Sequence, residues 1–256
     1  EPRDLEIIHG EAGTERFTLL DSHTTDWLGI FAAALGGKQI HQQDWAPTVA
    51  LRGIHLASAS EPVFVGARLQ FERLLHWTDR STLDLALLLD GDKAKGQQVG
   101  RREVAPLIVD HGQLKIGLHI RGDQFDIKHR PVSNRRSLKA SEWAELSIDS
   151  SAPVPYDAFD TISKDMQDLL TLASYEPCGS LRRTLIVTDR DSGAGRAGYR
   201  REVEVMGRQV YRTAPRDREP LPKYLFTLND MAFDELVPKW LALKETARMG
   251  CNILFG

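Results

Sequence analysis

The sequence has few cysteines and no long apolar run. Only two of its 256 residues are cysteine, Cys178 and Cys251, and they lie far apart in the chain. Two scattered cysteines are typical of a reduced protein with unreactive thiols, although one disulfide stays open as an alternative. No window approaches the roughly 18 apolar residues of a membrane span, and the first residues do not resemble a secretory signal. We therefore expect a cytoplasmic protein without a membrane segment.

The chain also lacks an excess of charge of either sign. It has 33 basic and 36 acidic residues, a formal net charge of −3 and a pI near 6.3. This balance gives no global attraction to nucleic acid or membranes, so any basic surface must be local. The 41% of hydrophobic and 27% of charged residues are ordinary for a soluble globular protein.

Motifs of metal, phosphate and hydrolase sites are missing as well. None of the eight histidines forms an i, i+4 pair, and no Gly-rich phosphate loop or nucleophile elbow is present. We expect no metal and no cofactor. His119 falls on the polar side of an alternating segment, which predicts a solvent-exposed side chain. Many aspartates could form an acidic pair, but nothing selects among them. Examples, most of them at predicted strand ends, are Asp84, Asp90, Asp92, Asp110 and Asp123.

What the first 150 residues do contain is a period-two pattern of apolar residues, typical of half-buried antiparallel strands. It is clearest over residues 63–71, where Val63, Val65, Ala67, Leu69 and Phe71 alternate with polar residues, and over residues 114–120. Further strands are predicted at residues 17–19, 49–51, 83–89, 125–127 and 146–148.

The pattern changes after Pro153. Apolar residues at helical spacing predict a helix over residues 156–173, with Asp157 and Asp160 in its first turn. Strands are predicted again at residues 181–188 and 201–211, and a last helix over residues 233–243, where Pro238 marks a start or a bend.

These patterns predict a mainly β (α+β) fold. We expect antiparallel, β-sandwich-like sheets with one central amphipathic helix and a C-terminal helix. The β-rich, sandwich-like part covers residues 1–150. Residues 151–256 add the helix, a β-hairpin and the C-terminal helix, packed on the first part.

Arginines are concentrated in the predicted hairpin. If its two strands pair, several guanidinium groups could share one face and bind phosphate or carboxylate groups. The alternative is a solvated strand surface with acidic neighbours. The candidate ligand- or partner-binding residues are Arg182, Arg183, Arg200, Arg208 and Arg212.

Four of the five tryptophans suggest different roles. Trp77 and Trp240 lie in apolar patterns and are predicted to be core residues. Trp27 and Trp45 flank a Gly-Gly loop, where they could form a ligand platform or anchor the loop. The first reading supports an alternative function, a stand-alone β-sandwich module that binds carbohydrate or another small ligand. A third hypothesis is a hydrolase that uses an unrecognised aspartate pair.

Several stretches resemble the ApeA N-terminal domain, which occurs in bacterial HEPN- and Toprim-associated proteins. The first is Phe-Thr-Leu-Leu-Asp at residues 17–21, and the second is Ala-Leu-Arg-Gly-Ile-His-Leu at residues 50–56, followed by Glu-Pro-Val-Phe. The others, in matching order and spacing, lie at residues 69–77, 166–173, 224–230 and 240–241. These are strand and helix patterns, so the resemblance concerns the fold more than the mechanism.

The resemblance implies a sensor or regulatory domain of an antiphage, abortive-infection ribonuclease, not itself an enzyme. In that family a helical HEPN domain follows and cleaves RNA with an Arg-to-His motif. The partners it implies are this C-terminal HEPN domain, a phage-derived protein or other phage trigger, and a second copy bound through the HEPN domain. Arg3 with His9 and Arg16 with His23 fit the spacing of the motif, but they fall in strand-like segments and are taken as chance. The apolar residues 253–255 would lead into the missing domain.

Overall fold

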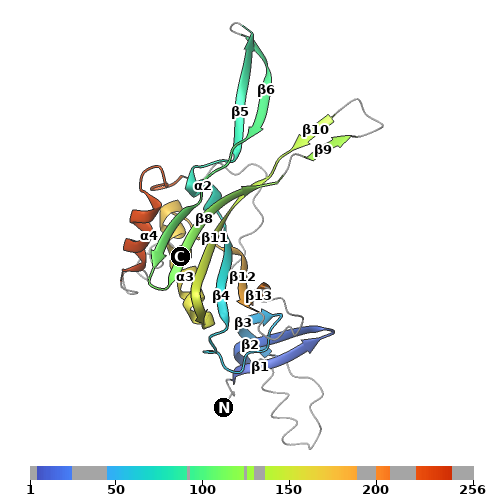
Figure 1. Ribbon diagram of the computed structural model, residues 1–256, viewed down its shortest axis with the longest axis vertical. Helices are drawn as coiled ribbons and strands as arrows, with labels where there is room; N and C mark the ends of the chain where they lie inside the picture. Colours follow the sequence, from blue (N-terminus) through green and yellow to red (C-terminus); the bar gives the residue numbers. More distant parts are fainter. Residues whose placement is uncertain are drawn as a thin grey trace, which may run out of the picture.

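The computed structural model describes residues 5–24, 45–90, 93–123, 126–129, 136–188, 200–207 and 223–243. Within these ranges, nine strands form one sheet in which every neighbouring pair is antiparallel (Figure 1). From one edge to the other, the strands are β1 (Leu5–Ala12), β2 (Glu15–Thr24), β3 (Trp45–Arg52), β13 (Arg200–Gly207), β12 (Ser180–Thr188), β4 (Phe64–Phe71), β11 (Glu142–Val154), β8 (Leu114–Gly122) and β7 (Leu107–His111).

The centre of the sheet is completed by strands that come late in the chain. The predicted hairpin is present as β12 and β13, and it lies between β3 and β4. The prediction of a mainly β, antiparallel fold is confirmed. The nine strands share a single sheet, and helices pack on its apolar face.

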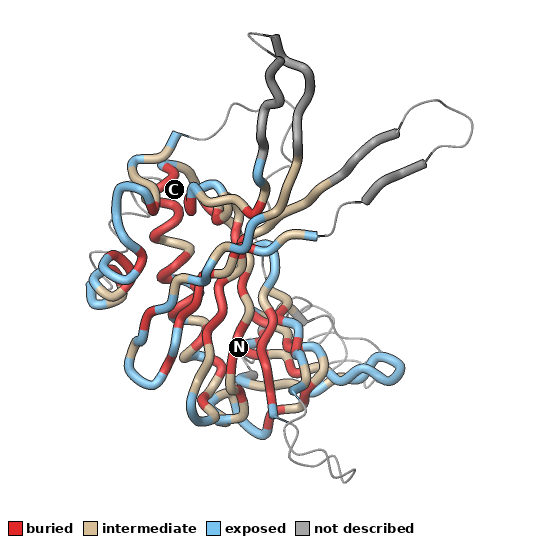
Figure 2. The backbone as a smooth tube through the Cα atoms, turned by 45° about the horizontal axis from the view of Figure 1, so that its top comes forward, coloured by how far each residue is buried: buried red, intermediate tan, exposed pale blue. Residues whose placement is uncertain are grey.

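Alternation along each strand gives this sheet two different faces. On β8, Ile116 and Leu118 are buried, and their partners on β11 are Ile148 and Leu146, which are both 0% exposed. These apolar side chains join the core cluster, and Figure 2 shows buried residues concentrated in the strands and helices of the body. The other face of the same strands carries polar side chains, so it is called the open face below.

The central helix forms as predicted. α3 (Tyr156–Ser174) begins after Pro155, carries Asp157 in its first turn and ends at Tyr175, whose φ of 57° is left-handed. It buries Phe159, Met166 and Leu169 in the core. Its length and its apolar stripe therefore position it across the apolar face of the sheet.

Two shorter helices complete this layer. α2 (Leu74–Thr78) follows β4 and buries Trp77 completely. α4 (Phe233–Leu241) begins at Phe233, so Pro238 lies inside it, and the Trp240 indole N–H donates to the backbone oxygen of Asp165 on α3 (2.6 Å). The prediction that Trp77 and Trp240 are core residues is confirmed.

One detail of the alternation was wrong. The period-two pattern placed Val65 on the same face as Leu69, but Phe64 is the residue that is 0% exposed there. The pairing of β4 with β12 shifts register between Ile186 and Val187, so that Val187 pairs with Phe64. The extra residue of such an irregularity turns the following side chains to the opposite face.

Two hairpins project from one end of the body, away from β1 to β3 (Figure 1). One consists of β5 (Leu83–Asp90) and β6 (Lys93–Arg101), which pair with each other. The other continues β8 and β11 as β9 (Asp126–His129) and β10 (Arg136–Lys139). The strands predicted over residues 83–89 and 125–127 belong to these hairpins, although Phe125 lies outside the described residues.

Side-chain contacts connect the bases of the two hairpins. Arg101, the last residue of β6, donates to the Ser141 carbonyl oxygen (3.5 Å). Glu142, the first residue of β11, accepts hydrogen bonds from the Thr82 backbone N–H (2.9 Å), the Thr82 hydroxyl (3.0 Å) and the Ser81 hydroxyl (3.0 Å). Arg102, just after β6, donates from Nε to the Ser81 carbonyl oxygen (2.8 Å). The residues that lead into β5 are therefore attached to the strand that carries the second hairpin.

A candidate ligand site on the open face of the sheet

The open face has a hollow that extends over five adjacent strands, from β13 to β8. Strand pairing places its side chains in register, because Gln70 on β4 lies opposite Arg182 on β12, and Trp143 on β11 lies opposite Arg121 on β8. The hollow has a volume of about 470 Å³. Its lining residues are Arg68, Gln70, Arg121, Trp143, Glu145, Arg182, Thr184 and Glu202.

Each of the three arginines in the hollow has a carboxylate neighbour, at increasing distance. Arg68 Nη2 lies 3.1 Å from an oxygen of Asp149, and its other terminal nitrogen donates to the Ala67 carbonyl oxygen (2.8 Å). Arg121 and Arg182 are 3.5 and 3.6 Å from Glu145 and Glu202.

The outer two arginines remain accessible. The side chains of Arg121 and Arg182 are 51% and 61% exposed, against 25% for Arg68. Solvent-exposed ion pairs of this kind contribute only about 0–1 kcal/mol, so a ligand can replace the carboxylate partner at little cost.

His119 lies beside the hollow and is held in place by its neighbours. It is half-buried, not solvent-exposed as predicted, and its Nε2 lies 3.0 Å from the Ser147 hydroxyl oxygen. A Cβ at position 117 would come within 2.8 Å of His119 Nε2, so glycine at this position leaves room for the imidazole. Burial lowers the pKa of His119, and the nearby charges of Arg121 and Arg68 lower it further, although Glu145 opposes them.

The predicted arginines are divided by the two faces of the sheet. Arg182 lines the hollow, and Arg200 is exposed with Nη1 3.9 Å from Asp149, outside the hollow. Arg183 lies on the other face, where its guanidinium group is 3.1 Å from Asp160 of α3 and its side chain is only 16% exposed. Arg208 and Arg212 lie outside the described residues.

Three residues of the hollow were not predicted as site residues: Arg68, Arg121 and Trp143. Each occupies a polar-side position of an alternating strand, but no local pattern shows that β4, β11 and β8 lie side by side in the sheet. The predicted platform cannot be compared with it, because Trp27 lies outside the described residues and the side chain of Trp45 is not described.

Comparison with known proteins gives one match. The chain matches the family described as ApeA N-terminal domain 1 over residues 1–240. It belongs to that family. The predicted resemblance is thereby confirmed, while no curated protein and no solved structure matches the chain.

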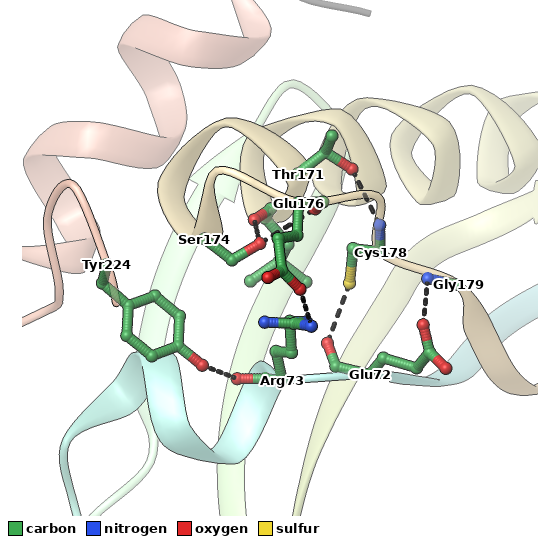
Figure 3. Close-up of polar contacts among 9 residues, drawn as sticks. Glu72, Arg73, Thr171, Ser174, Glu176, Cys178, Gly179 and Tyr224 are labelled. Carbon is green, nitrogen blue, oxygen red and sulfur yellow. Dashed lines mark hydrogen bonds and ion pairs between the residues drawn. The ribbon is translucent and has the colours of Figure 1, made fainter. Parts of the chain in front are cut away.

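A second polar cluster of this ApeA N-terminal domain lies at the end of α3 (Figure 3). Arg73 pairs with Glu176, and the Tyr224 hydroxyl donates to the Arg73 carbonyl oxygen (3.3 Å). The Cys178 thiol donates to the carbonyl oxygen of Glu72 (2.8 Å). These contacts tie β4, α3 and the segment before α4 together.

Cys178 is a structural member of this cluster. It is a free, buried cysteine, as expected for an unreactive thiol, whereas Cys251 lies outside the described residues. Burial, assisted by the charge of Glu72, raises the pKa of Cys178 to about 12. A thiol needs its thiolate form to act as a nucleophile, so Cys178 is poorly suited to that role near neutral pH.

The described part of this ApeA N-terminal domain has no group of three or more His, Cys, Asp or Glu side chains that could hold a metal ion. Across the same ranges, no helix has the length and apolar character needed to cross a bilayer.

Proposed function

We propose that this chain is the recognition domain of an ApeA-type antiphage ribonuclease. Its role would be to bind a phage-derived trigger in the cytoplasm and thereby to control RNA cleavage by a C-terminal HEPN domain. Family membership supports the class of protein. The hollow on the open face supports binding, because it groups exposed charged side chains on a rigid sheet.

The control would work through binding energy. A ligand shifts a two-state equilibrium only as far as its affinities for the two states differ. The open face is a suitable place for such a contact, since β11 and β8 continue from the hollow into the second projecting hairpin. A trigger that binds Arg121 and Trp143 would therefore contact the two strands that continue into the second projecting hairpin.

The single observation that carries this proposal is the exposed arginine pair, Arg121 and Arg182, in the hollow. The test uses cells that express the full-length gene and are challenged with a phage that the gene restricts. The variant is Arg121→Gln with Arg182→Gln. Losing two charge-assisted contacts should weaken trigger binding by about tenfold or more, so plaque formation should recover.

The matched control is Lys115→Gln, which removes one positive charge from the same face of β8 at an exposed position outside the hollow. We expect it to restrict phage like the unaltered protein. If the double variant folds normally and still restricts phage, the hollow is not the trigger site.

A separate experiment tests whether RNA cleavage depends on the C-terminal HEPN domain. The full-length product should cleave RNA once it is triggered, whereas residues 1–256 alone should not. Cleavage by this chain alone would overturn the proposal of a non-catalytic domain, and dimers of the full-length product alone would support pairing through the HEPN domain.

The alternative of a stand-alone carbohydrate module gains no support from the hollow. Its lining combines three arginines and two glutamates with one tryptophan. That set suits a charged ligand better than a neutral sugar.

A further inference from the structure

The lining of the hollow carries one more positive than negative charge, in a chain whose net charge is −3. Three arginines and two glutamates line it, and Arg68 also pairs with Asp149, which lies outside the lining. At neighbouring His119, the charges of Arg121 and Arg68 lower the pKa more strongly than Glu145 and Asp149 raise it. A positive local field in an acidic protein favours an anionic group at this place on the sheet.

The hollow also offers an aromatic surface beside the guanidinium groups. Trp143 lines it, is half-buried by the sheet and lies directly opposite Arg121. A ring held between strands stacks on another planar ring with little loss of conformational entropy. Aromatic and arginine side chains together are the usual platform for an unstacked base, and each stacked base contributes substantially to affinity.

The remaining lining groups can hydrogen-bond the edge of a base. The Gln70 amide both donates and accepts, the Thr184 hydroxyl does the same, and the carboxylates of Glu145 and Glu202 accept from amino groups. The volume of about 470 Å³ lies in the range of small-ligand sites. A polyanion without bases would place its negative charges against the Glu145 and Glu202 carboxylates, so a ligand that also carries amino groups fits the hollow better.

We infer that the hollow binds a nucleotide unit of a single-stranded nucleic acid. The base would stack on Trp143, and Arg121 and Arg182 would contact its flanking phosphates. A duplex is disfavoured because its bases are already stacked on one another. This inference rests on the proposed function, since it names the ligand class for the same hollow.

The test measures fluorescence anisotropy of this chain with a labelled single-stranded RNA of about ten nucleotides, within the roughly 4–16 nucleotides that single-strand binders cover. Arms with the same sequence as single-stranded DNA, as an RNA duplex, and with AMP as competitor separate the sources. Contact with two phosphates predicts a slope of log affinity against log salt of about −1.4.

Three variants and the Lys115→Gln control locate the binding. Arg182→Gln should weaken binding and reduce the salt slope by about 0.7, because one phosphate contact is lost. Trp143→Ala should weaken binding about tenfold with the slope unchanged, and Trp143→Phe should retain most of the affinity. Lys115→Gln should bind like the unaltered chain. Circular dichroism verifies that each variant is folded. If Trp143→Ala unfolds, Arg182→Gln still tests the site, because Arg182 is exposed and its substitution should not disturb the fold.

The inference is overturned if the single strands do not bind, if the duplex binds as tightly, or if AMP competes as well as the oligonucleotide. It is also overturned if Arg182→Gln binds like Lys115→Gln. Failure here and failure of the proposed function differ in outcome. If this chain binds no nucleic acid but the hollow variants lose phage restriction, the proposed recognition function holds and the trigger is of another chemical class. If the variants lose nucleic-acid binding but still restrict phage, the hollow binds nucleic acid but is not the site that recognises the trigger.

Discussion

At the scale of single residues, Arg182 and Arg183 are neighbours in β12 but lie on opposite faces of the sheet. Arg182 is 61% exposed in the hollow, whereas Arg183 is 16% exposed and pairs with Asp160. Asp160 also accepts a hydrogen bond from the Tyr156 hydroxyl (2.7 Å) and lies 2.7 Å from Lys164 Nζ. One carboxylate therefore connects the central helix with the centre of the sheet.

We predict that Asp160→Asn destabilises the fold by roughly 3 kcal/mol, because removing one partner leaves the Arg183 charge buried without compensation. The measurement is urea unfolding. Asp157→Asn is the control, since Asp157 is exposed in the first turn of the same helix and should cost only about 0.3–1 kcal/mol. Equal effects of the two substitutions would show that the Arg183 contact adds nothing.

A second prediction concerns pH. The folded-state pKa of His119 lies below its ordinary value of 6.5, chiefly through burial and Arg121. The unfolded chain therefore binds the proton more tightly, and stability falls as the pH drops below about 6.5 toward the folded-state pKa. His119→Gln should keep the contact with Ser147 and lose less stability between about pH 7 and pH 5. Urea unfolding along this series measures the difference, and parallel curves for the two proteins would contradict it.

At the scale of elements, the two projecting hairpins depend on how their bases are fixed. An isolated two-stranded hairpin is only marginally stable in water, and among the described residues β5 and β6 pair with each other and with no further strand. The Glu142 carboxylate attaches the residues before β5 to β11. The position of the first hairpin relative to the second thus depends on the Glu142 carboxylate with its three donors, and on Arg101 at the end of β6, which donates to the Ser141 carbonyl oxygen (3.5 Å).

We predict that Glu142→Ala loosens the first hairpin, because the Thr82 backbone N–H loses its acceptor. Thr82 is buried, so an unsatisfied amide there costs about 1–3 kcal/mol and should raise its local hydrogen-exchange rate at least about fivefold. Glu103→Ala, at an exposed position just after β6, is the control. Unchanged exchange at Thr82 in the Glu142 variant would show that the attachment lies elsewhere.

Local patterns predicted the elements well and the candidate site poorly. The helix over residues 156–173 and the strand pair 181–188 and 201–211 follow from spacing, turns and capping, all of which act within a few residues. The change of side-chain face at Val65 in β4 depends on the register with β12, which lies more than 100 residues away in the sequence. Arg68, Arg121, Trp143 and Arg182 come together for the same reason. Only Arg68 and Arg182 lay in predicted strands, because the strands predicted at residues 114–120 and 146–148 end or begin short of Arg121 and Trp143. The grouping of the four residues is a property of the strand order.

At the scale of the whole molecule, the strand order joins both parts of the predicted division. Residues 1–150 supply β3 and β4, and residues 151–256 supply β12 and β13 between them, together with α3 over the apolar face. Without the second part, β3 and β4 have no partners on their facing edges. Core side chains such as Phe64 and Leu146 would also lose their cover. Cutting the chain near the predicted boundary at residue 150 therefore tests whether the first part folds by itself or only when the second part packs on it.

We predict that residues 1–155 alone do not fold cooperatively, whereas residues 1–243 do. The physical reason is that the shorter chain exposes the apolar face on which α3 packs and leaves two inner strands as open edges, which favours aggregation. Urea unfolding followed by tryptophan fluorescence and circular dichroism is the measurement, and adding residues 156–243 in trans should restore a folded complex. If residues 1–155 unfold in one sharp transition at the midpoint of the longer chain, the first part is an independent domain, and β12 and β13 only extend it.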